Sequence, residues 1–167
     1  MGKDRVELIA ATYEGAMKAT LDAAKAVAVE KRMKQGQEGK AHPLWLMGHL
    51  AASFDVILNV MTLGSAPLLP SNYFKKFGPS QAGGDPVSSN ASDYPSWDEI
   101  VASYDKAGKA AIAKIRTLDD SDLPGGPKGS PPEAFKDFFK VRGQTLGAMA
   151  QHDAYHRGQI GMLAAFK

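Results

Sequence analysis

His152 and His156 are four residues apart in the stretch "QHDAYHRGQ", close to the C-terminal end of the sequence. On a helix this spacing puts both imidazoles on one face, about one turn apart, where two ring nitrogens can reach the same metal ion. The spacing alone is a weak signal. Two histidines can also share a helix face by chance and be satisfied by solvent or by partners in the core.

A third histidine, His49, makes a metal site the better interpretation. In residues 43–63 the apolar side chains recur at helical spacing within an arc of about 100°, and His49 lies inside that arc. His152 and His156 also lie on the apolar face of their segment. Unpaired polar groups are costly in a core, whereas a divalent cation binds neutral imidazoles and uses all three lone pairs. The sequence therefore favours a site formed by His49, His152 and His156. The alternative, in which each ring finds a Thr, Gln or Tyr partner, stays open.

Other metal and nucleotide sites fit the sequence poorly. The stretch resembles the H-E-x-x-H motif of zinc peptidases with Asp for Glu, but no His, Asp or Glu follows His156 to act as a third ligand. Phosphohydrolases with a His-Asp motif need a further downstream Asp, and di-iron bundles need E-x-x-H pairs, which the chain lacks. The stretch "GGPKGS" has the wrong order for a phosphate-binding loop. The chain has no cysteine, so thiolate ligands, cysteine nucleophiles and disulfides are excluded.

Two residues near the histidines are expected to have other roles. Asp153 is expected to pair with Arg157 on the surface, four residues further on, with a contact to a metal ligand as the alternative. His42 precedes His49 by seven residues, which is about 10 Å along a helix and too far to share one ion. We expect His42 at the start of its helix, outside the site.

Helical periodicity predicts the elements that must position these histidines, and no segment shows convincing strand alternation. Capping boxes are expected at Asp4 with Glu7 and at Ser96 with Glu99. The predicted helices are Asp4–Met33, Pro43–Leu63, Ser96–Leu118 and Ser130–Phe166, the last with an irregularity near Gly143.

Two links rich in Gly and Pro join the predicted helices, at residues 64–95 and 119–133. The longer one, with Tyr73, Phe74 and Phe77, is expected to be a crossover anchored by its aromatic residues, and a cover over the open end of the bundle is the alternative. No domain boundary is evident. Residues 1–167 are therefore predicted to form a single all-α domain, a four-helix bundle.

Composition narrows the classes of partner. The 167 residues carry a formal net charge of +2, and the basic residues are scattered, which argues against a nucleic-acid surface. The first residues are charged, unlike a secretory signal, and no apolar run approaches the roughly 20 residues of a membrane span. The expectation is a cytoplasmic protein without nucleic-acid or membrane partners.

Three stretches together resemble the DinB/YfiT-like family of metal-binding four-helix bundles: "LWLMGHLA", "DYPSWDEIVASYDKA" and "HDAYHRGQI". The resemblance spans nearly the whole chain in the right order. It implies a divalent ion, with zinc or nickel as the leading choices, held by His49, His152 and His156. It also implies an up-down-down-up order of helices and a homodimer.

The resemblance further implies a choice of functions. Relatives include thiol-dependent S-transferases and metal-dependent hydrolases, so the first hypothesis is a metal-dependent enzyme acting on a small molecule, with a low-molecular-weight thiol as one candidate. Tyr155 is a weak catalytic candidate, as a donor to substrate, with core packing as the alternative. Gln159 is a second weak candidate that would orient a ligand or water, with a structural hydrogen bond as the alternative. The competing function is a non-catalytic metal-binding or stress-associated protein in which the ion is structural.

Overall fold

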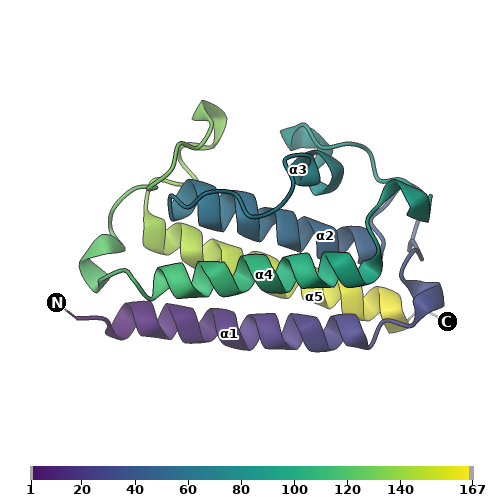
Figure 1. Ribbon diagram of the computed structural model, residues 1–167, viewed down its shortest axis with the longest axis horizontal. Helices are drawn as coiled ribbons and strands as arrows, with labels where there is room; N and C mark the ends of the chain where they lie inside the picture. The colour runs from purple at the N-terminus through teal and green to yellow at the C-terminus, as the bar shows by residue number, and fades with distance from the viewer. Residues whose placement is uncertain (1, 166–167) are drawn as a thin grey trace.

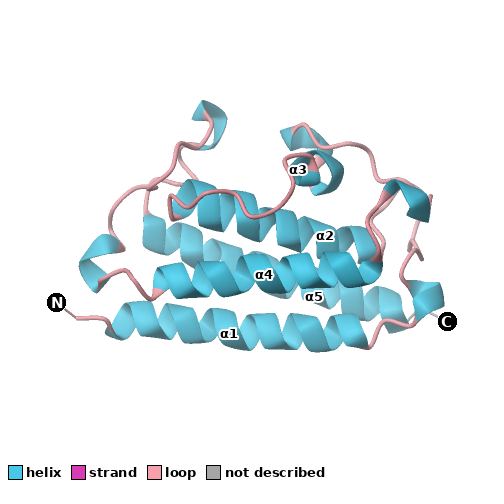
Figure 2. Ribbon diagram, viewed as in Figure 1, coloured by secondary structure: helices cyan, strands magenta, loops and turns pink. Residues whose placement is uncertain are grey.

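The computed structural model describes residues 2–165, and over these residues it contains helices and loops but no strands (Figure 2). The predicted all-α class is confirmed. Four helical segments are long, and one short helix, α3 (Tyr73–Phe77), lies in the crossover. The long segments are α1 (Asp4–Lys25), α2 (Pro43–Ser53) continued by a π-helix (Phe54–Thr62), α4 (Trp97–Ile115) and α5 (Arg142–Ala165).

The long helices pack side by side, with α1 against α4 and α5, and α2 against the same two helices (Figure 1). Tyr13 of α1 donates to the Leu146 carbonyl of α5, and seven residues further along both helices Thr20 donates to Asp153. These matched positions show that α1 and α5 run in the same direction. Arg116, at the end of α4, instead reaches Glu7 near the start of α1, so α1 and α4 are antiparallel.

Aromatic rings fill the centre of the bundle. Phe54 lies between Tyr13 and Tyr104, with ring centroids 5.8 Å and 5.2 Å away, and all three side chains are fully buried. Gly108 lets α4 lie close to this core, because a Cβ there would lie 2.3 Å from the sulfur of Met17 and 3.2 Å from the Phe54 ring. The inward residues of α1, α2 and α4 therefore form the core that their helical spacing predicts.

Two predicted helix boundaries are wrong. The first helix ends at Lys25 rather than Met33, and a 3-10 turn follows at Val29–Lys31. Val27 is the last residue of the apolar stripe, and Val29 is 71% exposed, so a longer helix would have no apolar face to pack.

The last helix begins at Arg142 rather than Ser130, after a 3-10 turn at Glu133–Phe135. The start of α5 is held by the preceding link, because the Arg142 amide donates to Gly125 O and the Gly143 amide donates to Leu123 O. The predicted end at Phe166 lies outside the described residues.

The two predicted capping boxes differ in outcome. The box at Ser96 and Glu99 is confirmed, with both reciprocal hydrogen bonds present. The box at Asp4 is wrong, because Asp4 is the first helical residue and the residue before it, Lys3, makes no side-chain cap. The Asp120 carboxylate caps α1 instead, accepting from the Arg5 and Val6 amides at 3.3 Å and 3.0 Å.

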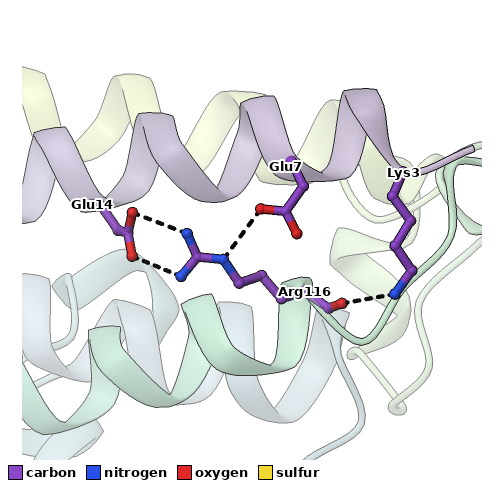
Figure 3. A network of polar contacts seen from close by, with 4 residues as sticks. All are labelled: Lys3, Glu7, Glu14 and Arg116. Atoms are coloured by element: carbon purple, nitrogen blue, oxygen red, sulfur yellow. Dashed lines mark hydrogen bonds and ion pairs between the residues drawn. The ribbon is translucent and has the colours of Figure 1, made fainter.

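A network at the same end of the bundle joins α1 to α4 (Figure 3). Arg116 makes two hydrogen bonds to the Glu14 carboxylate and a third to Glu7, while Lys3 donates to the Arg116 carbonyl. Glu7 and Glu14 are half exposed and Arg116 is 40% exposed, so the network contributes less to stability than the apolar core does.

The expectation that no apolar run approaches the length of a membrane span is wrong, because the second long segment, Pro43–Thr62, is long and apolar enough by composition to cross a membrane. Yet 78% of its most apolar window is buried among the other helices. The apolar composition of this segment is therefore accounted for by its central place in the bundle.

We expect Asp120→Ala to lower the free energy of unfolding by about 1 kcal/mol, because it removes the acceptor for two first-turn amides of α1. Asp4→Ala is the matched control, since it removes an acidic residue from the same turn without removing a cap. Urea denaturation checks both variants. An effect of Asp4→Ala as large as that of Asp120→Ala would contradict the assignment.

Candidate metal centre

Three imidazoles from two helices converge on one point. His49 lies on α2, and His152 and His156 lie one turn apart on α5. The Nε2 atoms of His49 and His156 each lie 3.1 Å from Nε2 of His152. The structure therefore brings together all three residues that the sequence singles out as metal ligands, in a cluster able to hold an ion.

A backbone carbonyl on α3 orients His49. Its Nδ1 lies 2.8 Å from the carbonyl oxygen of Phe77, which can only accept, so Nδ1 carries the proton and Nε2 keeps its lone pair. Gly48 makes this contact possible, since a Cβ there would lie 2.2 Å from the Phe77 ring. On the other side, the Trp45 ring stacks on His49 at 5.0 Å.

His156 is oriented in a similar way. Its Nδ1 lies 2.7 Å from Oε1 of Gln159, and the amide nitrogen of Gln159 donates to the Tyr155 hydroxyl. His156 therefore also carries its proton on Nδ1 and turns the Nε2 lone pair towards His152. A ring N–H held by a carbonyl is the usual arrangement behind a metal-bound histidine.

The donor set fits a divalent cation. Two bare lone pairs face a third nitrogen, and His152 can donate one Nε2 proton to only one of them, so a metal-free cluster keeps an unfavourable contact. The Nδ1 of His152 is buried without a partner among the described residues. With zinc–nitrogen bonds of about 2.0–2.1 Å, nitrogens at tetrahedral angles lie about 3.3 Å apart, close to the separations seen here.

Electrostatics keeps the imidazoles neutral, which is the form that binds metal. Burial, reinforced by His156, lowers the pKa of His49 to about 4. Burial and the two neighbouring imidazoles lower the pKa of His152 to about 3. Burial also lowers the pKa of His156, with the Gln159 hydrogen bond opposing it.

The cluster forms one wall of a cleft of about 540 Å³. The π-helix contributes Val56, Ile57 and Met61, and the crossover contributes Phe74, Pro79 and Ala82. The 132–139 segment, which the sequence analysis places inside the last helix, contributes the third side. Its lining residues are Pro132, Phe135, Phe138 and Phe139.

The crossover combines the two roles considered from the sequence. Tyr73 and Phe77 are buried and anchor it, as expected for a packed connection. Phe74 from the same short helix lines the cleft. The Phe77 carbonyl also positions His49, a role that no sequence pattern predicts.

Tyr155 and Gln159 lie behind the histidines. Tyr155 is 64% exposed, which rules out core packing, and it is not among the residues that line the cleft. Gln159 holds His156 through its side-chain oxygen. The structure thus gives Gln159 a contact with a candidate ligand, while a catalytic role for either residue stays a prediction.

The expectation for Asp153 is wrong. Asp153 is fully buried, and its carboxylate accepts from the hydroxyls of Thr20 and Tyr104 at 2.8 Å and 2.6 Å. It points towards α1 and α4 because it is 100° around α5 from His152. Burial raises the pKa of this carboxyl, while the hydrogen bonds from the two hydroxyls and the positive charge of Arg157 oppose the rise.

His42 behaves as expected. It caps the start of α2, where Nδ1 accepts from the Trp45 amide at 3.1 Å, and its Nε2 lies 3.0 Å from the Ser88 carbonyl. It is not part of the three-histidine cluster.

Comparison with protein families assigns the chain to one superfamily. The family model of the DinB superfamily matches residues 12–160, so the chain belongs to this superfamily. Neither the curated proteins nor the solved structures include a match.

The low pKa values of the histidines predict acid sensitivity in metal-free protein. An unfolded chain binds protons at these residues below about pH 6.5, whereas folded His152 does so only near pH 3, so stability falls as the pH falls between these values. With the metal removed by a chelator, lowering the pH from 7 to 5 should reduce the free energy of unfolding of the wild type by roughly 1–2 kcal/mol more than that of His152→Gln. Urea denaturation at both pH values measures this difference. Equal losses would contradict it.

Asp153→Ala should lower the free energy of unfolding by roughly 2–4 kcal/mol, because two buried hydroxyls lose their acceptor. Asp105→Ala removes a carboxylate from an exposed pair with Lys109 and should cost no more than about 0.5 kcal/mol. The triple variant Asp153→Leu, Thr20→Val and Tyr104→Phe replaces all three hydrogen-bonded side chains by apolar ones. It should recover part of the lost stability. Equal losses of stability in Asp153→Ala and Asp105→Ala would contradict the role of Asp153 as a buried hydrogen-bond acceptor.

Proposed function

We propose that this chain is a metal-dependent enzyme that binds one divalent ion, zinc or nickel, through His49, His152 and His156. The observation that carries the proposal is the convergence of three Nε2 atoms with the lone pairs of His49 and His156 turned inwards. Membership of the DinB superfamily supports the same site.

The form of the site favours catalysis over a structural role. Three protein ligands leave a coordination position open, whereas structural zinc sites use four. The histidines line a cleft large enough for a small molecule, and a structural ion would need no such cleft. Bound there, a divalent ion would supply a Lewis-acid position at which water or a thiol loses its proton near neutral pH.

The chain's own groups provide the remaining functions. The Phe77 carbonyl and Gln159 fix two of the rings, so the nitrogens are oriented before any ligand arrives. The apolar walls exclude water and strengthen electrostatic interactions at the cluster. Two reaction types remain in the proposal, hydrolysis and transfer of a low-molecular-weight thiol to a small-molecule substrate.

The wider expectations from the family belong to the same proposal. They are a single domain, the up-down-down-up order, a cytoplasmic location and a homodimer. The packing directions of α1, α4 and α5 support the helix order. The homodimer rests on the family resemblance, because the exposed apolar residues Leu8 of α1 and Met162 of α5 lie near opposite ends of this parallel pair of helices.

Metal analysis of purified protein should find close to one equivalent of zinc or nickel per chain, and His49→Ala should lose it. His42→Asn is the matched control, because Asn also caps a helix and His42 is outside the cluster. Gln159→Leu should weaken metal binding by roughly 10- to 100-fold, since it removes the acceptor that orients His156.

Activity separates a catalytic ion from a structural one. Chelated wild type should keep its helical circular dichroism and lose turnover in a panel of hydrolase and thiol-transfer assays. Metal retained by His49→Ala would overturn the site. Collapse of the fold on chelation, with no activity in the loaded protein, would instead support the structural role.

A further inference from the structure

The cleft beside the histidines contains no charged side chain among the described residues that line it. Its polar groups are the three imidazoles, the Ser53 hydroxyl and the Trp45 indole. Everything else on its walls is aliphatic, aromatic or proline. A charged ligand body lying against these walls would therefore lose its hydration without gaining an opposite charge from any lining side chain.

Three phenylalanines form the side of the cleft supplied by the segment before α5. Phe139 is buried, whereas Phe135 and Phe138 are 46% and 42% exposed. Phe138 packs edge-on against Phe139, with centroids 5.0 Å apart. Large half-exposed rings beside a concave site usually mark surface that a ligand covers.

The neighbouring structure holds this aromatic side in place. The Thr145 hydroxyl on α5 donates to the Phe138 carbonyl, and the buried Arg142 guanidinium donates to the carbonyls of Asp122 and Gly126. On the facing side, the Lys128 and Gly129 amides donate to the Thr62 and Met61 carbonyls of the π-helix. The rings are thus tied to the same helices that carry the histidines.

We infer that the site takes an uncharged, apolar small molecule, with an aryl or alkyl body and one metal-binding group such as a thiol or a carbonyl. The body lies against Phe74, Phe135 and Phe138, and the binding group faces the three Nε2 atoms. The inference rests on the proposed function for its metal contact, but the apolar part of the site is independent of the ion. Thiols that carry a carboxylate are expected to bind poorly, because the carboxylate would be buried against the apolar walls of the cleft.

The test uses N-phenyl-1-naphthylamine, an uncharged fluorophore that brightens in apolar surroundings, with zinc-loaded wild-type protein. We expect saturable binding at one site per chain, weakened about tenfold by Phe138→Ala. Val29→Ala is the control, because Val29 is an exposed apolar residue that does not line the cleft. Binding unaffected by Phe138→Ala, or weakened equally by Val29→Ala, would overturn the inference.

A matched pair of thiols tests charge directly. Phenylmethanethiol should displace the fluorophore at a concentration at least about 100-fold lower than mercaptoacetate does, because its ring gains contact with the apolar walls, whereas the carboxylate meets no cationic side chain there and can pair only with the ion. Phe138→Lys should narrow that gap, since it places an ammonium at the rim. Equal or stronger displacement by mercaptoacetate from the wild type would overturn the inference.

The two proposals fail separately. If His152→Ala binds no zinc but still binds the fluorophore, the apolar site stands and its affinity is independent of the metal. If wild type binds zinc and turns over substrates but does not bind the fluorophore, the apolar site is wrong and the metal-dependent function stands.

Discussion

The hydrogen bonds of one buried carboxylate fix the rotation of α5, and the candidate site depends on that rotation. Asp153 accepts from Thr20 of α1 and Tyr104 of α4, so this face of α5 is turned towards both helices. His152 and His156 then face α2 from another side of the same helix, at the distance from His49 that the cluster needs. A buried carboxylate is costly without partners, and here two hydroxyls supply them, so other rotations of α5 are disfavoured.

Close backbone approach fixes the second half of the cluster. Gly48 lets the Phe77 ring lie directly against α2, and the Phe77 carbonyl then reaches His49. The crossover thus does more than join two helices, because its short helix α3 sets the tautomer of a candidate ligand. One turn of α3 adds an aromatic wall through Phe74. The contact that packs the crossover against α2 is therefore also the contact that orients His49.

Local patterns in the sequence predict much of this, because they report on local physics. Helical periodicity gives the four long segments and the inward position of His49, and the S-x-x-E box gives the start of α4. Interactions between distant segments were not predictable in this way. Asp120 caps α1 from more than a hundred residues away, and Asp153 looks exposed until α1 and α4 surround it. The phenylalanines at 135–139 fit a continued helix as well as a wall, and only the bonds made by Arg142 and Gly143 exclude the helix.

The neutral imidazoles and the apolar walls have a common physical origin. Burial that lowers the histidine pKa values also removes the water that would solvate a charged ligand. Neutral rings without an ion leave lone pairs facing one another, so the same burial that keeps them unprotonated makes a divalent cation the natural partner. That cation would be the one full charge in a cleft that has no charged lining residue among those described. The carboxylate of a ligand could pair only with the ion, because no lining side chain carries a positive charge. An apolar ligand body instead gains free energy by burying its surface against the walls. Burial therefore connects the metal preference of the site with its preference for uncharged ligands.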